Sequence, residues 1–281
     1  MIAQTSISAP ENQPPPQHVV GLVPGPGSPR ILVSPLLAEL GVRHGFTTRL
    51  GGVSTGRYES LNLGEKWGDE PARVRENLRR VASDGHFAAE ELCQVVQVHG
   101  TEVALVDADT VERRGRQADG MATRASRVLG SYSADCVCIL IADGQGRAAA
   151  VHAGWRGTVA GIAAQAVDAL VSLGARPGSL RAALGPSIGP CCFQVKEDVA
   201  GRFRSLLPAA VLTRPDAQGQ AQLYVDLRRT NRHFLESAGV PADCIADTPP
   251  CTCCDPQRFF SFRRDGAGIG QHLAFIVGGC S

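Results

Sequence analysis

The sequence predicts an α+β fold, and three observations carry that prediction. Short strand-like runs alternate irregularly with glycine-rich loops and a few amphipathic segments. Successive strand-like runs are mostly joined by short turns, as in hairpins, instead of by the helices that connect parallel strands. The chain is also long and apolar enough to bury a sizeable core, with 281 residues of which 43% are hydrophobic.

The N-terminal 30 residues are predicted to form a disordered tail. They include seven prolines and few apolar anchors, a composition that buries too little surface to offset the entropy lost on ordering. Residues 31–281 are predicted to form a single domain.

The helices are predicted from apolar residues at helical spacing. In residues 70–82, for example, Val74, Leu78 and Val81 fall on one face, and the arginines are interpreted as a solvated surface. The same spacing predicts the other helices at residues 36–40, 158–173, 197–207 and 227–237.

The strands are predicted from short runs of β-branched and other apolar residues. Residues 92–98 and 101–106 are expected to pair as a hairpin, and the polar residues 111–117 to form a loop. Two continuous apolar runs flank a turn, one over residues 137–141 and one ending near His152, and they predict neighbouring buried strands. The other strands are predicted near residues 46–47, 128–132, 180–184, 223–225, 244–246 and 273–277.

Charge and hydropathy argue against several classes of protein. The net charge of +1 and the pI of about 7.6 give no electrostatic case for binding nucleic acid or an acidic membrane surface. No apolar run is long enough to span a bilayer, and the N-terminus lacks the pattern of a secretory signal. We therefore expect a cytoplasmic protein, and a monomer because nothing in the sequence indicates an interface. Its ten cysteines are expected to be free, buried or metal-bound.

Three residues are candidates for one metal site. Cys136 and His152 stand at the outer ends of the two buried runs, and His99 ends a strand-like run upstream. Zinc accepts thiolate and imidazole ligands, and three protein ligands leave a fourth position open for water or substrate. Two alternatives stay open, namely a Cys–His nucleophile pair and histidines that are only structural.

The remaining cysteines and histidines give weaker signals. Cys251, Cys253 and Cys254 match half of the zinc nucleobase deaminase pattern, but the H-x-E half is absent from the chain. These three are interpreted as inert rather than as a second metal site, and Cys191 and Cys192 as packed. The seven histidines include no H-x-H pair, so a multi-copper centre is not favoured.

Several motifs together resemble the YfiH family, also called the laccase-domain or polyphenol oxidase family. They run in order over most of the chain as HGFTTRLGGVS, NLG, QVHG, ADG, ADCV, HAGWRG, GPSIGPCCFQV and FFSFRRDG. The resemblance implies a single catalytic domain with a layered α/β sandwich and a mixed sheet, similar in outline to the cysteine-dependent catalytic domain of a bacterial toxin. It also implies zinc bound by His99, Cys136 and His152.

The resemblance further implies action on purine nucleosides. The expected reactions are phosphorolysis of adenosine, inosine, guanosine and methylthioadenosine, and deamination of adenosine. On this hypothesis Cys136, His152 and Asp135 are the catalytic residues. Asp135 or Asp119 would carry a proton, or would instead orient a zinc ligand.

The substrate-binding candidates are three arginines and one asparagine. Arg49, in the glycine-rich loop over residues 44–64, is the first candidate for phosphate, followed by Arg156 and Arg263. Asn62 is expected to contact the ligand. Structural ion pairs are the alternative for the arginines. Trp155 either stacks on a purine or packs in the core.

The sequence departs from the family pattern near its end. Ile269 and Gln271 stand where many members have threonine and arginine, which puts the substrate range in question. Two other functions also stay open. One is a cysteine hydrolase that uses Cys136 and His152. The other is a non-enzymatic, zinc-stabilised binding protein.

Overall fold

The computed structural model describes residues 21–108 and 113–279. Its strands are β1 (Val23–Gly25), β2 (Ser28–Val33), β3 (His44–Thr47), β4 (Leu92–Val96), β5 (Val103–Val106), β6 (Arg113–Gln117), β7 (Gly120–Thr123), β8 (Val128–Ser133), β9 (Val137–Ala142), β10 (Ala148–Ala153), β11 (Arg181–Leu184), β12 (Gln194–Val195), β13 (Val211–Pro215), β14 (Ala221–Val225), β15 (Ile245–Ala246) and β16 (His272–Val277). Its α-helices are α1 (Pro35–Ala38), α2 (Pro71–Asp84), α3 (Trp155–Val159), α4 (Ile162–Ser172), α5 (Glu197–Leu206), α6 (Leu227–Ser237) and α7 (Phe262–Asp265).

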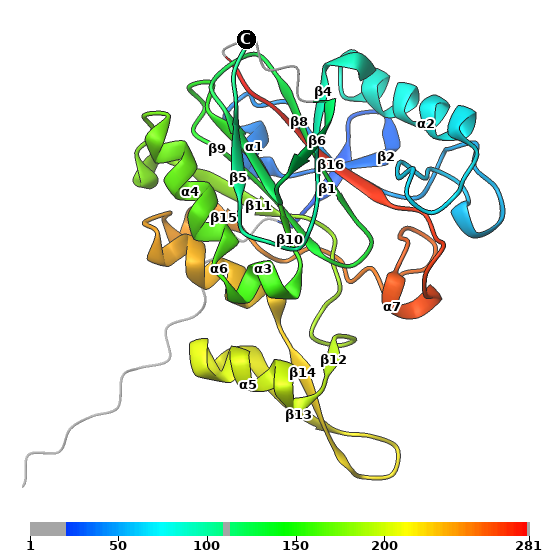
Figure 1. The fold of residues 1–281 in the computed structure, drawn as a ribbon, viewed down its shortest axis with the longest axis vertical. Coiled ribbons are helices and arrows are strands. Elements are labelled where there is room, and N and C mark those ends of the chain that lie inside the picture. The colour runs from blue at the N-terminus through cyan, green and yellow to red at the C-terminus, as the bar shows by residue number, and fades with distance from the viewer. Residues whose placement is uncertain (1–20, 109–112, 280–281) are drawn as a thin grey trace, which may run out of the picture.

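Two large sheets pack face to face to form the body of the molecule (Figure 1). One has seven strands in the order β1-β2-β3-β16-β8-β4-β6, and the other has six in the order β15-β11-β9-β10-β7-β5. Both are mixed, because β4 runs parallel to β8 and β5 parallel to β7, whereas β16 and β10 pair antiparallel with their neighbours. This confirms the predicted α+β class and the layered sandwich with mixed sheets.

The strands of the six-stranded sheet are apolar on both faces because both faces are covered. In β9, Cys138 and Leu140 join the core between the two sheets, whereas Ile139 and Ile141 join the core beneath the helices. Side chains alternate between the faces of a strand, so a continuous apolar run is what a strand covered on both sides requires. The predicted pair of buried strands is confirmed as the antiparallel pair β9 and β10.

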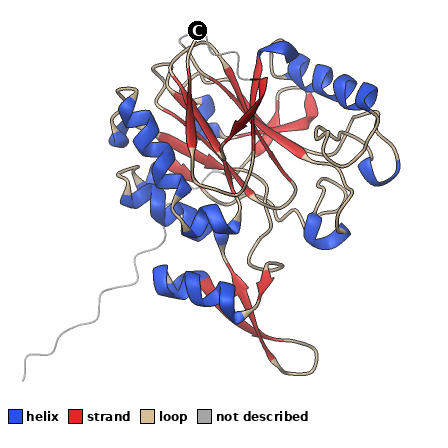
Figure 2. Cartoon of the chain, in the orientation of Figure 1, coloured by secondary structure: helices blue, strands red, loops and turns tan. Residues whose placement is uncertain are grey.

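The helices form the outer layers (Figure 2). Helices α4 and α6 pack on the six-stranded sheet through residues such as Ile162, Leu170 and Leu235. On the other side of the molecule, Val81 of α2 packs with Leu273 and Phe275 on the outer face of the seven-stranded sheet. A smaller sheet, in the order β12-β14-β13, projects from the body together with α5 (Figure 1). No helix in the described ranges is both long and apolar enough to cross a bilayer.

Two strand predictions are wrong. β4 and β5 do not form a hairpin, because they belong to different sheets and the chain crosses between the sheets from 97 to 102. Backbone N–H groups in that crossing, including those of Val98 and Gly100, donate to the carboxylate of Asp119 instead of to a hairpin ladder. Residues 113–117, predicted as a loop, form β6 at the edge of the seven-stranded sheet, where a polar strand can face solvent.

The helix predicted over residues 158–173 is two helices. α3 ends at Val159 and α4 begins at Ile162, and Gly161 between them has a φ of 82°. That left-handed conformation ends one helix and redirects the chain, and glycine adopts it without steric cost. The predicted helices over residues 70–82 and 227–237 are confirmed as α2 and α6.

Regular secondary structure is present before residue 31. β1 and β2 form a hairpin at the edge of the seven-stranded sheet, where prolines such as Pro24 are tolerated. Pro29 precedes the first residue of β2 that pairs with β3, Ile31, so its missing N–H costs no ladder bond there. The rest of the predicted tail, residues 1–20, lies outside the described residues.

Candidate functional site

His99, Cys136 and His152 converge at one end of the sandwich. Their ligand atoms all lie within 4.8 Å of one another. The two imidazole rings meet edge to face, with centroids 4.8 Å apart. The structure therefore brings together the three residues that the sequence separates by up to 53 positions.

The fold explains why these three residues meet. His99 and Cys136 both lie where the chain passes from the seven-stranded sheet to the six-stranded sheet, after β4 and after β8. His152 lies near the end of β10, opposite Cys138 of β9 in the antiparallel register. Cys136 lies just before β9, two positions from Cys138, so the alternation of side chains places it on the same side of the sheet as Cys138 and its partner His152.

Asp119 fixes the position of His99. Its carboxylate accepts hydrogen bonds from the backbone N–H groups of Val98, His99 and Gly100, at 3.1, 2.9 and 2.7 Å. His99 has a φ of 61°, an unusual conformation for a residue with a side chain. The three hydrogen bonds hold the backbone in that conformation, at a strain of about 1–3 kcal/mol for such a residue.

The same carboxylate orients His152. Asp119 Oδ1 lies 2.8 Å from His152 Nδ1, and both side chains are buried. Burial alone would raise the pKa of Asp119, but the hydrogen bonds from His152 and from backbone N–H groups outweigh it and lower that pKa. Because Nδ1 is engaged, Nε2 is the ring nitrogen that remains for a ligand.

Cys136 has the character of a thiolate. Burial would raise its pKa, but the charge on His152 and hydrogen bonds from His152 and His99 lower it to about 6. For His152, burial would lower the pKa, and the Cys136 thiolate and Asp119 raise it to about 9. For Cys138, only two residues away, burial raises the pKa to about 12, and the hydrogen bond with the hydroxyl of Ser131 offsets this only in part. One thiolate and two imidazoles, one backed by a carboxylate, fit a zinc ion.

Gly154 of the HAGWRG motif leaves the space that the cluster occupies. A Cβ atom at this position would lie 2.3 Å from His99 Nδ1 and 3.4 Å from Cys136 Sγ. Its φ of −67° is an ordinary value, so the constraint is space rather than backbone conformation. Any side chain here would displace His99.

The cluster lies in the wall of a cavity of about 800 Å³. That volume is within the range of small-molecule sites. Aromatic side chains and three cations line it alongside the cluster. The aromatic residues are Trp67, Tyr132, Trp155, Phe193 and Phe262, and the cations are Lys66, Arg75 and Arg263.

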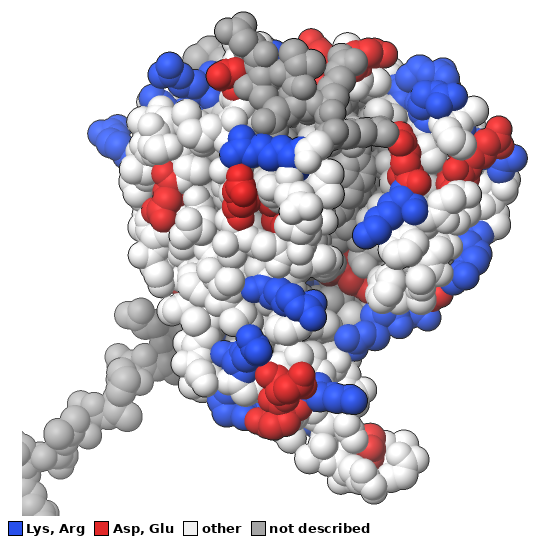
Figure 3. Space-filling view, viewed as in Figure 1, with Lys and Arg blue, Asp and Glu red and all other residues white. Residues whose placement is uncertain are grey.

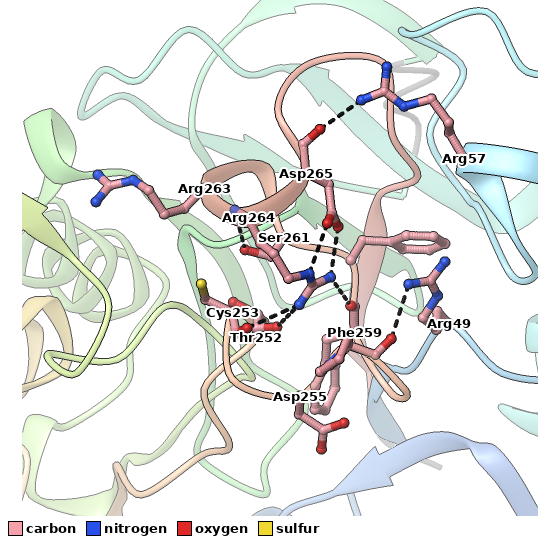
Figure 4. Close-up of polar contacts among 12 residues, drawn as sticks. Arg49, Arg57, Thr252, Cys253, Asp255, Phe259, Ser261, Arg263, Arg264 and Asp265 are labelled. Atoms are coloured by element: carbon pink, nitrogen blue, oxygen red, sulfur yellow. Dashed lines mark hydrogen bonds and ion pairs between the residues drawn. The ribbon is translucent and has the colours of Figure 1, made fainter.

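Among the four predicted substrate-binding residues, only Arg263 lines this cavity. Arg49 lies on the other side of the loop that carries Arg263 (Figure 4). Its guanidinium donates to the carbonyl oxygens of Glu59 and Pro256, at 2.6 and 3.0 Å, and stacks on a phenylalanine ring. Arg156 stacks on the ring of Trp155, outside the cavity lining.

Asn62 is buried behind the cavity wall. Its amide holds the backbone of Gly64 and Gln271, with hydrogen bonds of 2.9 Å to each. Both of these residues line the cavity, so Asn62 acts on its shape and does not reach a ligand directly. The departures from the family pattern, Ile269 and Gln271, both face the cavity.

Asp135 lines the cavity, but its carboxylate is already occupied. It accepts hydrogen bonds from Thr252 Oγ1 at 2.6 Å, Ser261 Oγ at 3.0 Å and the backbone N–H of Arg263 at 2.7 Å. Burial nevertheless raises its pKa above the ordinary value. Asp135 thus connects Cys136, its neighbour in sequence, to the loop that carries Arg263.

Sequence reasoning missed two of the three cations in the cavity. Arg75 belongs to a row of arginines on α2 that was interpreted as a solvated face, and Lys66 lies in the loop before that helix. Both are exposed, and the helical pattern does not tell which arginine overlooks the cavity. On the face of the molecule that Figure 3 shows, basic and acidic side chains are interspersed and form no large patch of one sign.

Comparisons with known proteins identify the family of the chain. The model of a family described as multi-copper polyphenol oxidoreductase laccase matches residues 43–278. A purine nucleoside phosphorylase of Deinococcus radiodurans is 39% identical over 253 residues, which are 89% of this chain and 93% of that protein. Adenosine deaminase RL5, from an unknown prokaryotic organism, is 36% identical over 245 residues, covering 82% of this chain and 92% of that protein.

Solved structures share the fold. The crystal structure of the hypothetical protein YfiH of Bacillus licheniformis superposes with a TM-score of 0.81 at 32% sequence identity. The match covers 91% of this chain and 98% of that one.

Proposed function

The chain belongs to the family described as multi-copper polyphenol oxidoreductase laccase, and because its relatives include proteins named as a purine nucleoside phosphorylase and an adenosine deaminase, we propose that it is a zinc-dependent enzyme of purine nucleosides. The proposed reactions are phosphorolysis of adenosine, inosine, guanosine and methylthioadenosine, and deamination of adenosine. The observation that carries the proposal is the open cluster of His99, Cys136 and His152 in the wall of the 800 Å³ cavity.

The donor set favours zinc over a multi-copper centre. One thiolate with two imidazoles suits zinc, and a set of three leaves a position for water or substrate. In the described part of the chain, the other group able to hold a metal consists of cysteines alone, so no further histidines gather near the first group. When bound, zinc would act as a Lewis acid and lower the pKa of a water molecule.

The residues around the cluster have separate roles in this proposal. Asp119 keeps the proton of His152 on Nδ1 and fixes the backbone of His99, so that both imidazoles face the ligand position. The aromatic residues of the cavity, including Trp155 and Tyr132, provide flat apolar surface for a purine.

Phosphorolysis requires cations near the sugar. A phosphate oxygen forms a bond to C1′ of the ribose while the bond from C1′ to the purine nitrogen breaks and its electron pair leaves with the base. Lys66, Arg75 and Arg263 are the cations that line the cavity, and we assign phosphate binding to them. Arg263 uses one guanidinium nitrogen on the carbonyl oxygens of Cys192 and Gln194, which leaves its other N–H groups for an anion.

The role of Asp135 is that of a positioning residue in this proposal. Three hydrogen bonds already occupy its carboxylate. A proton-carrying role, the alternative from the sequence, stays a prediction. Replacement by asparagine would separate the two, because a positioning role predicts a weaker affinity for phosphate, whereas a proton carrier predicts a change in the pH profile of kcat.

A product assay tests the proposed function. Purified protein is incubated with adenosine, with and without phosphate, and the products are separated by chromatography. We expect adenine only with phosphate, or inosine in either buffer, and neither product from Cys136→Ala. Cys138→Ala is the matched control, since Cys138 lies two residues from Cys136, within β9, and is buried in the core between the sheets. No conversion of any of the four nucleosides by the zinc-loaded protein would contradict the proposal.

One observation favours a second candidate, a cysteine hydrolase. Asp119, His152 and Cys136 form a chain of contacts with a thiolate at its end, as in a cysteine nucleophile with its base. A thiol-alkylating reagent would then abolish activity and removal of zinc would not. The position of His99 beside the same thiol is the reason to place this candidate second.

A further inference from the structure

Four cysteines outside the candidate functional site come together where two loops meet. Cys191 and Cys192 lie in the loop that follows β11, and Cys251 and Cys254 lie in the loop between β15 and α7. The sulfur atoms of all four lie within 4.8 Å of one another. The sulfur of Cys254 is 3.5 Å from that of Cys191 and 3.3 Å from that of Cys192.

These distances suit a metal-bound set better than disulfides. A disulfide needs about 2.05 Å between sulfurs. Four sulfurs placed tetrahedrally at about 2.3 Å from a zinc ion are about 3.8 Å apart. The observed separations of 3.3 and 3.5 Å are close to that edge length.

The two loops are held together independently of the thiols. The backbone of Ser187 pairs with Cys251 as an isolated parallel bridge, and the N–H of Thr252 donates to Ser187 O at 3.1 Å. The guanidinium of Arg228, on α6, donates to the carbonyl oxygens of Ser187, Pro249 and Pro250, at 2.5, 2.7 and 2.9 Å. A rigid frame of this kind fixes the thiols before a ligand binds.

The surroundings of the thiols match those of a metal site. The N–H of Gly189 donates to Cys251 Sγ at 3.2 Å, the kind of outer hydrogen bond that supports a ligating thiolate. A Cβ atom at Gly189 would lie 3.0 Å from Cys191 Sγ, so a larger residue would push that sulfur away. Cys251 and Cys254 have the C-x2-C spacing common in structural zinc sites.

We propose that Cys191, Cys192, Cys251 and Cys254 form a second metal site, which binds Zn²⁺ through four thiolates and has a structural role. Four protein ligands fill the coordination of zinc and leave no position for water or substrate. The site is thus chemically distinct from the three-ligand cluster of the proposed function and does not depend on that function being correct.

The site would stiffen one wall of the cavity. Thr252, between two of the cysteines, donates to Asp135, and the carbonyl oxygen of Cys192 accepts from Arg263. Arg264 also holds the loop that contains Thr252 and Cys253 (Figure 4). Its guanidinium donates hydrogen bonds to the carbonyl oxygens of both residues. A metal that clamps the two loops would fix Arg263 and Asp135 in place.

Metal content tests the proposal directly. The full chain is produced with zinc and a reducing agent, freed of loosely bound metal, and analysed for zinc by mass spectrometry. We expect two zinc ions per wild-type chain, one in the double variant Cys251→Ser/Cys254→Ser, one in Cys136→Ala and none in the combination of all three changes. Cys244→Ser is the matched control and should retain two, because Cys244 belongs to neither group.

A second measurement keeps the test valid if the double variant folds poorly. Cobalt replaces zinc in the wild-type protein and in Cys136→Ala, and the sulfur-to-cobalt charge-transfer absorption is recorded. We expect Cys136→Ala to retain most of that absorption, because four of the five ligating thiolates would belong to the new site.

Two results would overturn the proposal. One is a wild-type chain with a single zinc ion that the double variant keeps and Cys136→Ala loses. The other is rapid reaction of the four cysteines with a thiol reagent in the folded wild-type protein without release of metal, as expected of free thiols. The charge-transfer absorption would then disappear in Cys136→Ala.

Discussion

The two groups of candidate metal ligands differ in almost every physical respect. The first consists of His99, Cys136 and His152, lies at strand ends and opens onto a cavity of about 800 Å³. The second consists of four cysteines on two loops. A buried carboxylate, Asp119, stands behind the first group, and a cationic frame around Arg228 stands behind the second. On the proposals made above, the first arrangement would leave a ligand position for chemistry, and the second would close around its ion.

Ligand number and the charge behind the ligands would thus distinguish a catalytic metal site from a structural one. A carboxylate behind an imidazole raises its basicity and orients it, which matters where a bound group must react. A guanidinium near thiolates offsets negative charge and adds rigidity. The two groups meet through Thr252 and Asp135, so changes in one should reach the other only weakly.

Loss of the single thiolate of the first group should have the largest effect. Cys136→Ala is expected to lower kcat/KM for adenosine phosphorolysis at least about 1,000-fold, because a catalytic metal supplies several kcal/mol and each 1.36 kcal/mol is about tenfold. Steady-state kinetics with and without phosphate measure this. A loss below tenfold would mean that Cys136 does not hold the reacting centre.

Adding a side chain at Gly154, beside the first group, should reduce activity nearly as much. Gly154→Ala places a methyl group 2.3 Å from the present position of His99 Nδ1. We expect activity to fall about 100-fold, the cost of a misplacement of about 1 Å, with weaker zinc binding. Gly178→Ala is the control, because a Cβ there meets nothing within 4 Å. Equal activity of the two variants would argue that His99 can move freely.

Removing the negative charge of Asp119 should reduce activity less than removing one of the three candidate ligands does. Asp119→Asn is expected to weaken zinc affinity about 10–100-fold, the usual effect of changing a residue that orients a ligand. Competition with a chromophoric chelator gives the affinity, and the four-cysteine group serves as an internal reference because Asp119 does not touch it. An equal loss of zinc affinity at the three-residue group and at the four-cysteine group would indicate general unfolding.

Removing the hydrogen bond that connects the two groups, between Thr252 and Asp135, should have the smallest effect on activity. Thr252→Val removes the hydrogen bond to the buried carboxylate of Asp135, at a cost of about 1–3 kcal/mol in the free energy of unfolding. We expect a rise of a few-fold in the KM for phosphate, through Arg263, and unchanged zinc content. Denaturant unfolding and phosphate titration measure the two effects. An unchanged KM with lowered stability would show that Thr252 supports the fold alone.

Much of the fold was predictable because local signals were strong. The apolar runs of β9 and β10 indicated strands covered on both faces, and the helical pattern of residues 227–237 gave α6 with its bounds. The hairpin over residues 92–106 was wrong because hydrophobic spacing does not encode which sheet a strand joins. The crossing at His99 depends on Asp119, whose carboxylate replaces the ladder that a hairpin would have made.

For the two sites as well, local sequence motifs were informative, whereas contacts between segments far apart in the sequence were not predictable. The three residues of the first group were predicted to share one site because their motifs are specific, although their meeting depends on two crossings between sheets. Arg49 was assigned to phosphate from loop composition, which cannot tell which way a guanidinium points. The cysteines at 191, 192, 251 and 254 were interpreted as inert or packed because the bridge between Ser187 and Cys251 is visible only in the fold.

Removal and return of zinc would show whether the proposed activity depends on the metal. Wild-type protein is stripped of metal with a chelator, assayed for conversion of adenosine to adenine or inosine, and assayed again after zinc is restored, with Cys136→Ala treated in parallel. We predict that activity disappears when zinc is stripped and returns when zinc is restored in the wild type, and that it is absent throughout in Cys136→Ala. Activity that survives stripping, yet is abolished by alkylation of the thiol, would contradict this prediction and identify a cysteine nucleophile instead.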